Sequence, residues 1–450
     1  MSQTAVILNI KKPIFGTRTR AIVFAIVRFS AISLIPKLLA LFKDMAVAAR
    51  FGASHVLDIY LMAYVLIGVP VSVIAIAFQT VLIPSLVEKN DEEASSLLGQ
   101  VIKLVLILLT VALPIWLIIL PKLFSILYPQ TPDDSRKAIL EACMWLIPYY
   151  FINGINILLY GALQARKSFW PNALLPALFP FAILAALWLV PEPRLGILLG
   201  GTVAGSGAEG LLLLSLLRKA KLIQWGRELK TGVMKLSRLA APIVVGGIVS
   251  SFGPVLEQLI AFRLGEGAVS LLSYGFKVPA ALSSLFVTAI GVVVLPHFSE
   301  IVVQKSWDAY RTLYLWACTI VILWGLAITG VCVILSGDIV RLLFQRGEFQ
   351  MSHTIEATKV MRMYLFQFPL LLMLLVSQRA LVAIEKTLAI GIITITQVIV
   401  SGLFSYWLSV HMGVSGVALG TTIGTFIATT LSSLAVLKCL NRLLKESKVE

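Results

Sequence analysis

The sequence is poor in the residues that soluble enzymes and metalloproteins use most. Only 13% of its 450 residues are charged, and it has four cysteines and four histidines. The cysteines form no CxxC pair and no cluster with the histidines, which argues against a metal site or a disulfide framework. No P-loop, no HExxH helix and no GxSxG strand–turn–helix motif is present. We therefore expect neither an enzyme nor a bound cofactor or metal.

Apolar residues, in contrast, are abundant and occur in long runs. Hydrophobic residues make up 59% of the chain, and Val101–Leu120 and Val321–Leu335 are two of the runs. About 20 apolar residues are needed to cross the hydrocarbon core as a helix. The runs are continuous rather than alternating, which excludes the strands of a membrane barrel. The sequence therefore predicts an all-α polytopic membrane protein.

The runs predict about twelve transmembrane helices. The expected spans are 22–48, 57–86, 98–120, 138–165, 171–191, 196–217, 239–264, 268–298, 311–335, 356–384, 387–409 and 413–437. The second, fourth, eighth and tenth are longer than a bilayer requires, so we expect them to tilt or to extend beyond it.

The net charge of +15 is concentrated in alternate loops and at the termini. The basic positions are Lys11, Lys12, Arg18, Arg20, Arg166, Lys167, the dense stretch 218–238, Lys438, Arg442, Lys445 and Lys448. The loops between them are short and carry little positive charge. By the positive-inside rule, both termini are predicted to be cytoplasmic. No basic stripe alternates with exposed aromatic residues, so nucleic acid is not an expected partner.

Two stretches of the chain resemble each other. The stretches are Ala49–Glu88 and Phe262–Glu300. Each has an arginine as its second residue, followed two residues later by glycine, and each closes with a proline four residues before the final glutamate. Twelve spans then divide into six plus six, with parallel orientation, as in transporters built from repeats. The predicted units are a six-helix lobe at 1–220, a basic cytoplasmic linker at 221–238 and a six-helix lobe with a short tail at 239–450. The alternative is chance similarity between two helix pairs.

Charged residues inside the predicted spans indicate a site. Lys37 and Asp44 are seven residues apart, so they share one face of a helix, and Lys43 is close by. The second half contributes Lys277 and Glu257 at membrane depth. Charges in hydrocarbon cost several kcal/mol, about 2.5–3.5 on insertion scales, unless they are compensated. The surplus of basic groups favours a cavity for an anionic ligand such as a phosphate. The alternative is that the lysines extend to the membrane interface.

Four blocks carry a resemblance to a known family. "KDMAVAARFGASHVLDIYLMAY", "IPYYFINGINILLYGALQARKSFWPNALLPAL", "GAVSLLSYGFKVPAALSSLFVTAIGVVVLPHFSE" and "LLFQRGEFQMSHTIEATKVMRMY" resemble, in order, regions of the MurJ/MviN lipid II flippases. These belong to the multidrug/oligosaccharidyl-lipid/polysaccharide (MOP) exporter superfamily. The resemblance is collinear over most of the chain. It implies two six-helix lobes in a V around a central cationic cavity.

The resemblance also implies roles for individual residues. Family basic positions fall on Lys37, Lys43 and Lys277, which would hold the substrate's pyrophosphate, and a family acidic position falls on Asp58. All three basic residues are lysine where the family has arginine, so bidentate geometry is lost. A further basic position falls on Val71, and the chain has about two spans fewer than is common in the family.

The resemblance implies a flippase of the bacterial inner membrane that works by alternating access. Its substrate would be an undecaprenyl-pyrophosphate-linked saccharide, with the peptidoglycan precursor lipid II as the leading candidate. The departures leave a flippase for an O-antigen or exopolysaccharide repeat unit open, and further alternatives are a cation-coupled multidrug exporter and a non-transporting scaffold of envelope synthesis. Expected partners are this substrate, membrane lipid and envelope-synthesis proteins.

The energy source stays open at this stage. Asp44, Glu257 and Arg263 are candidates for ion coupling or for charge balance. We favour charge balance, because a single carboxylate is a poor ion site. Membrane potential, Na⁺ and H⁺ all remain as coupling hypotheses.

Overall fold

In the computed structural model the described residues are 17–127, 133–190, 192–220, 222 and 231–446. Within these ranges, side chains are described except at 17–31, 231–232, 287–289 and 291–293. All regular secondary structure in the described chain is helical, and none is strand. The prediction of an all-α fold is confirmed.

The helices follow the predicted spans closely. The first half contains α1 (Thr17–Phe51), α2 (His55–Val87), α3 (Asp91–Leu127), α4 (Asp133–Trp145), α5 (Ile147–Ala165), α6 (Trp170–Leu174), η1 (Leu175–Ala177), α7 (Leu178–Leu189) and α8 (Leu195–Lys219). The second half contains α9 (Thr231–Phe262), α10 (Ala268–Val303), α11 (Trp307–Ile334), α12 (Ser336–Phe344), α13 (Met351–Ala383), α14 (Thr387–Met412) and α15 (Val414–Glu446). Because α9 begins at Thr231, the last eight residues of the predicted linker are already helical, and residues 223–230 lie outside the described chain.

The expected count of about twelve spans fits these helices. Ten helices within the described residues are long and apolar enough to cross a bilayer. The pair α4–α5 would be an eleventh span, bent by 48° at Leu146. Pro148 in the first turn of α5 explains the break, because its ring prevents a regular helix from continuing through this point. With 35 residues, α1 is a further helix of membrane-spanning length.

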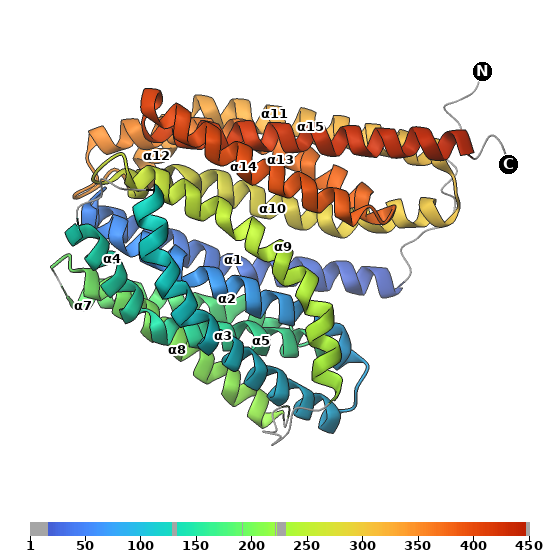
Figure 1. The fold of residues 1–450 in the computed structure, drawn as a ribbon, viewed down its shortest axis with the longest axis horizontal. Coiled ribbons are helices and arrows are strands. Elements are labelled where there is room, and N and C mark those ends of the chain that lie inside the picture. The colour runs from blue at the N-terminus through green and yellow to red at the C-terminus, as the bar shows by residue number, and fades with distance from the viewer. Residues whose placement is uncertain (1–16, 128–132, 191, 221, 223–230, 447–450) are drawn as a thin grey trace.

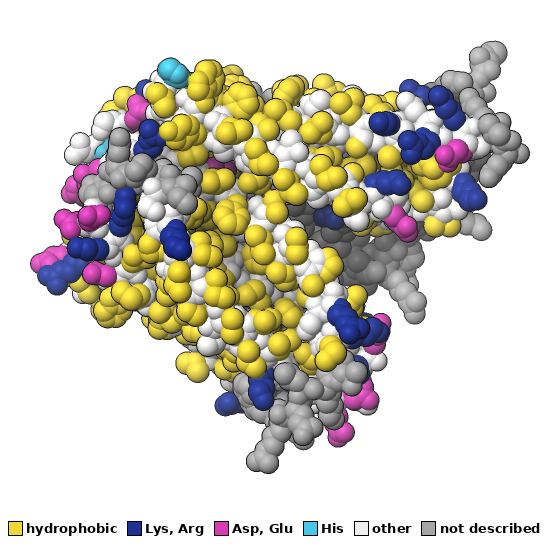
Figure 2. All heavy atoms as spheres, viewed as in Figure 1, with side chains coloured by type: hydrophobic (Ala, Val, Ile, Leu, Met, Phe, Trp, Pro, Cys, Tyr) yellow, Lys and Arg dark blue, Asp and Glu magenta, His cyan; other side chains and the backbone are white. Residues whose placement is uncertain are grey.

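The helices form two lobes that meet at one end of the molecule and separate toward the other (Figure 1). The first lobe contains α1–α8 and the second α9–α15, and α9 lies against α2 as well as against α14. The beginning of α1 and the end of α15 both lie at the wide end. Apolar side chains cover the visible body of both lobes, while charged side chains gather at the two ends (Figure 2). This distribution fits a protein surrounded by lipid along its sides.

Each lobe is organised around one central helix. In the first lobe α2 packs against α3, α4 and α5, and its Leu66 and Ile67 are almost fully buried. In the second lobe α13 packs against α10, α11 and α15. The contact between α14 and α15 is close because Gly420 and Gly424 face Ser405 and Ser401, leaving no room for a Cβ. Small residues allow such helix contacts where water provides no driving force.

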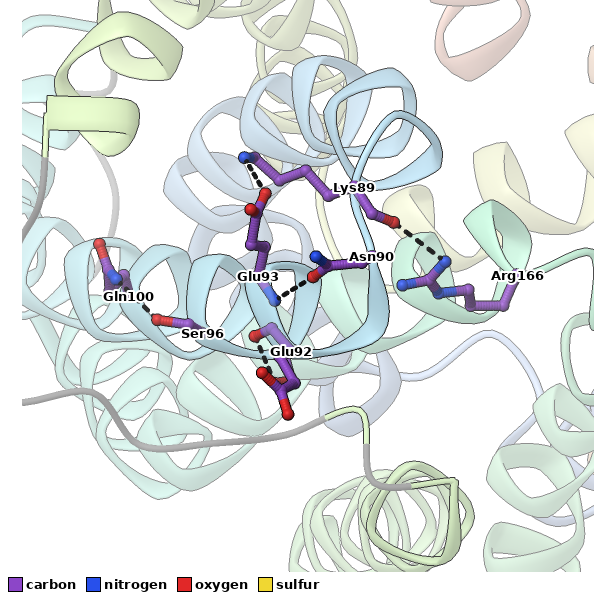
Figure 3. Close-up of polar contacts among 8 residues, drawn as sticks. Lys89, Asn90, Glu92, Glu93, Ser96, Gln100 and Arg166 are labelled. Carbon is purple, nitrogen blue, oxygen red and sulfur yellow. Dashed lines mark hydrogen bonds and ion pairs between the residues drawn. The ribbon is translucent and has the colours of Figure 1, made fainter.

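At the wide end of the first lobe, polar contacts hold the α2–α3 turn (Figure 3). Asn90 accepts a hydrogen bond from the backbone N–H of Glu93 at 2.9 Å and so caps α3. Lys89 forms an ion pair with Glu93 at 2.9 Å. Arg166, at the end of α5, donates to the carbonyl of Lys89 and pairs with Asp91 at 2.8 Å. This predicted basic loop therefore ties two helix ends together.

Candidate substrate-binding site

A small, partly open pocket lies between the lobes. Its lining residues come from α1, α2, α7, α8 and α10, and are Lys43, Asp44, Val47, Leu57, Tyr60, Leu61, Ile183, Leu198, Ser273, Tyr274 and Lys277. Two of the three predicted phosphate-binding lysines, one from each lobe, are thus brought to one cavity. The tyrosines were not predicted, since the sequence alone does not show which tyrosines of different helices meet.

Asp44 holds the two lysines together. Its Oδ1 lies 2.7 Å from Nζ of Lys43, and its Oδ2 lies 3.0 Å from Nζ of Lys277. The side chains of Lys43 and Asp44 are only 16% and 13% exposed, whereas that of Lys277 is 35% exposed. The three formal charges sum to +1. This supports the hypothesis of charge balance for Asp44, although its role in ion coupling stays a prediction.

Lys37 is placed differently from the other two lysines. It is exposed and does not line the pocket. Seven residues separate it from Asp44, so it lies on the same face of α1, about 10 Å farther toward the wide end. Lys37 therefore lies between the pocket and the wide end along α1, and its role in substrate binding stays a prediction.

Asp58 is fully buried and faces the beginning of α10 rather than the pocket. It accepts hydrogen bonds from the backbone N–H of Gly267 and of Ser270, both at 2.7 Å, and from Oγ of Ser270 at 2.5 Å. Gly267 is the N-cap residue of α10 and has no side chain to cap the helix. Asp58 supplies that cap from the opposite lobe. Its role in substrate binding stays a prediction.

Further contacts close the narrow end around Asp58. The N–H of Glu348 donates to the carbonyl of Ala49 at 2.9 Å, and the N–H of His55 donates to Oε1 of Glu266 at 3.2 Å. Gly347 has φ +56°, and a Cβ there would overlap the carbonyl of Ala49. The α1–α2 corner of the first lobe is therefore held by two turns of the second lobe.

Glu257 and Arg263 lie in the second lobe and outside the pocket. Oε2 of Glu257 accepts a hydrogen bond of 2.9 Å from the hydroxyl of Tyr364. The guanidinium of Arg263, just beyond the end of α9, lies 4.7 Å from the centre of the Tyr406 ring, a cation–π contact. Neither residue lies beside the lysines. Their participation in ion coupling stays a prediction.

Val71, where the family resemblance implies a basic residue, is fully buried in the first lobe. It faces Gly154 of α5 and does not line the pocket. A residue that the sequence analysis missed is Glu209 of α8, which is 9% exposed. The signal was present, because this carboxylate lies inside the apolar span predicted at 196–217.

Two helical lobes around a pocket whose charged residues sum to +1 form the architecture of a polytopic membrane protein with a cationic cleft. Solved structures agree on the fold. A structure described as lipid II flippase MurJ in an inward closed conformation superposes with a TM-score of 0.74 at 21% identity, covering 94% of this chain and 91% of that one. An inward-facing multidrug-resistance MATE transporter of the MOP superfamily gives 0.73 at 15% identity, covering 93% and 99%. An outward-facing MATE transporter gives 0.63 at 15%, covering 94% and 96%.

The family model described as "Lipid II flippase MurJ" matches residues 47–447, and the chain belongs to this family. A probable lipid II flippase MurJ of Buchnera aphidicola is 22% identical over 352 residues, which are 76% of this chain and 69% of that protein. Lipid II flippase MurJ of Burkholderia cenocepacia is 23% identical over 347 residues, 74% and 67% of the two chains. For the Vibrio cholerae relative the match covers 54% of its length at 26% identity. The predicted resemblance is thus confirmed.

Proposed function

We propose that this protein translocates lipid II across the bacterial inner membrane, with the pyrophosphate of the substrate bound by Lys43 and Lys277. The observation that carries the proposal is the Lys43–Asp44–Lys277 cluster, which joins the two lobes inside the pocket. A diphosphate cannot cross hydrocarbon without replacement of its hydration shell. Two ammonium groups supply that replacement in the pocket between the lobes.

The chemistry of the cluster suits transient binding. A lysine 4 Å from a phosphate charge contributes about 4 kcal/mol at an effective dielectric constant of 20. Asp44 competes with the phosphate for both lysines, which weakens binding and favours release. The lysines are point charges rather than planar forks, so they can follow a moving phosphate. The lipid tail stays in the bilayer outside the cleft.

The arrangement of the lobes supports alternating access, with the wide end facing the cytoplasm. Both described chain ends lie at the wide end, together with the basic loops that contain Lys89, Arg166 and Lys167. This agrees with cytoplasmic termini under the positive-inside rule. Lys37 lies on the route from that side to the pocket. Opening the narrow end and closing the wide end would then expose the substrate to the outer leaflet.

Complementation of a bacterium depleted of its own lipid II flippase tests the proposal. We expect growth with the wild-type protein and none with Lys43→Ala. Lys359→Ala is the matched control, because that lysine is 54% exposed, pairs with Glu356 and lies outside the pocket. Membrane fractionation has to show equal insertion of all three proteins. Equal growth with Lys43→Ala would contradict the role of the pocket.

The same experiment separates lipid II from related substrates. The failure of inserted wild-type protein to restore growth would reject lipid II as the substrate. Repeating the assay in strains that lack an O-antigen or exopolysaccharide flippase would then identify another lipid-linked saccharide. Rescue that survives every lysine replacement would favour a scaffold in envelope synthesis.

A further inference from the structure

A polar stripe on α8 leads from the pocket into the first lobe. Leu198, Thr202, Ser206 and Glu209 follow one another at spacings of four, four and three residues, so they lie on one face of the helix. Leu198 lines the pocket. The Oγ1 of Thr202 shares a hydrogen bond of 2.8 Å with the hydroxyl of Tyr60, which also lines the pocket. The stripe therefore connects Glu209 to the wall of the substrate site.

Among the described residues, Glu209 is a buried carboxylate without a cationic partner. It is 9% exposed and accepts a short hydrogen bond from the hydroxyl of Tyr160 on α5. Within the described chain no lysine or arginine forms an ion pair with it. A buried ionised carboxylate without a partner costs several kcal/mol, and such groups normally bind a proton or a cation.

Asn156 provides a second, independent observation. It is 3% exposed, and its Nδ2 donates to the carbonyl of Ser206 at 3.1 Å. Its Oδ1 is buried and accepts no hydrogen bond. That oxygen would lie 2.7 Å from a Cβ at Gly210, so it faces the turn of α8 that carries Glu209. A buried acceptor without a donor thus lies against Gly210, the residue that follows Glu209.

We propose that Glu209, with Tyr160 and Asn156, is a proton-binding site of the first lobe that is coupled to anion binding in the pocket. An ionised Glu209 accepts from Tyr160 and leaves Oδ1 of Asn156 unpaired. A protonated Glu209 gains an O–H donor, and in this proposal Oδ1 of Asn156, which faces the neighbouring Gly210, becomes its acceptor. Tyr160 would then serve the ionised form of the site and Asn156 the protonated form.

The groups that face this site are tyrosines rather than charges. Tyr160 and Tyr149 come from α5 and Tyr64 from α2, whereas α7 has no titratable side chain. The hydroxyl of Tyr149 donates to that of Tyr64 at 3.1 Å, and the ring of Tyr64 lies 6.0 Å from that of Tyr60. These contacts join Tyr149 to Tyr60, which lines the pocket and is hydrogen-bonded to Thr202 of the stripe on α8.

The sign of the coupling follows from charge. An ionised Glu209 adds a negative charge to the lobe that receives an anion, and protonation removes it. Protonation should therefore strengthen anion binding, and anion binding should promote protonation, because linkage is reciprocal. Translocation of the substrate would then carry a proton with it. The proton site and its coupling do not depend on the proposed function. Only the assumption that the bound anion is the pyrophosphate of lipid II rests on it.

Infrared difference spectroscopy of the reconstituted protein tests the proton site directly. As the pH falls, wild type should gain the C=O band of a protonated carboxyl group. Glu209→Gln should lack this band. Tyr160→Phe removes a donor to the ionised form and should move the midpoint of this band to higher pH. Asn156→Val removes an acceptor for the protonated form and should move it to lower pH. A band that is absent, or that shifts in the same direction in both variants, would overturn the site.

Binding of inorganic pyrophosphate tests the coupling. Pyrophosphate itself changes protonation with pH, but it does so equally for both proteins. The quantity to compare is therefore the affinity of Glu209→Gln divided by that of wild type, measured at each pH. We expect a ratio near one at acidic pH and about fivefold or more at alkaline pH, the usual scale of coupling between sites. Glu356→Gln, which changes an exposed carboxylate of the other lobe outside the pocket, should keep the wild-type pH dependence. A ratio that does not vary with pH would overturn the coupling.

The two experiments also separate this inference from the proposed function. A titrating Glu209 band with coupled pyrophosphate binding, in a protein that restores no flippase strain, would leave the site standing and reject the substrate. Growth restored equally by wild type and Glu209→Gln at all pH values, without the band, would retain the substrate and reject the site.

Discussion

Asp44 and Asp58 both reach from the first lobe to α10, but they hold different kinds of partner. Asp44 pairs with the flexible side chains of Lys43 and Lys277 beside an open pocket. Asp58 accepts hydrogen bonds from Gly267 and from Ser270 at the start of α10, in a site without exposed surface. Ser270 and Lys277 are seven residues apart, so the two contacts hold α10 at levels about 10 Å from each other.

The two contacts are therefore expected to have different roles, one at the pocket and one at the narrow end. A phosphate can replace Asp44, because an ammonium group accepts either anion with a small rotation. No ligand can replace Asp58 without entering the buried interface, so that contact breaks only when the lobes separate. The Asp44 contacts should therefore change when substrate binds, whereas the Asp58 contacts should change when the lobes separate at the narrow end.

Removing Lys277 should have the largest effect. Lys277→Ala takes away the only pocket lysine contributed by the second lobe and leaves Asp44 with one partner. The variant loses one lysine–phosphate interaction of about 4 kcal/mol at an effective dielectric constant of 20, so we expect at least a hundredfold loss of flipping. Lys277→Arg keeps the charge and should retain most activity. The measurement is the flipping rate of lipid II in proteoliposomes, and equal loss in both variants would show that shape rather than charge matters.

Removing Asp58 should open the narrow end. Asp58→Ala leaves the N–H groups of Gly267 and Ser270 without acceptors, at a cost of about 1–3 kcal/mol each. A shift of tenfold or more toward outward-open states is expected, since 1.4 kcal/mol corresponds to a factor of ten. The reporter is a disulfide between His55→Cys and Glu266→Cys, two positions joined across the closed end by the hydrogen bond from the backbone N–H of His55 to Glu266.

Crosslinking at this pair should be fast in an otherwise wild-type protein and slow with Asp58→Ala. The native cysteines are first replaced, and Lys277→Ala serves as the matched control that should crosslink normally. Flipping should stop when the disulfide forms and resume on reduction. Fast crosslinking with Asp58→Ala would show that Asp58 does not hold the end closed.

Replacing Asp44 should have a smaller effect of opposite sign on binding. Asp44→Asn changes the charge of the cluster from +1 to +2 and removes the competitor for both lysines. Inorganic pyrophosphate should bind about tenfold more tightly, in the usual range for loss of one close charge interaction. Slower release should lower the flipping rate at the same time. Weaker pyrophosphate binding would mean that Asp44 positions the lysines instead of competing with the ligand.

The sequence was sufficient to predict the helices and the lysines, but not their partners. Continuous apolar runs locate spans because each helix satisfies its own backbone, and α2, α8 and α13 end within a few residues of the expected limits. The spacing of Lys37 and Asp44 showed a shared helix face. Which side chain of another lobe meets that face depends on packing, so the pairing of Asp44 with Lys277 could not be derived.

The capping role of Asp58 could not be derived from the sequence for the same reason. Asp58 caps a helix that begins 209 residues later in the chain, at Gly267 of the other lobe. Such a distant contact leaves no pattern in the local sequence. Loop glycines that resembled each other in sequence, Gly52 and Gly265, do share a positive φ, of 57° and 111°. The two matching glycines of the repeat thus both occupy the positive-φ region that favours glycine. The repeat could not show that the corner of one half would lie on that of the other.

The smallest effect is expected at the wide end, far from both carboxylates. Lys89 is partly exposed and pairs with Glu93 one helical turn away (Figure 3). Exposed pairs of this spacing contribute about 0.3–0.5 kcal/mol, and salt screens them. Lys89→Ala should change the midpoint of thermal unfolding by less than the error of most assays and leave flipping intact, because Asn90 still caps α3. A marked loss of flipping would place a substrate contact at the mouth of the cleft and extend the cationic path beyond Lys37.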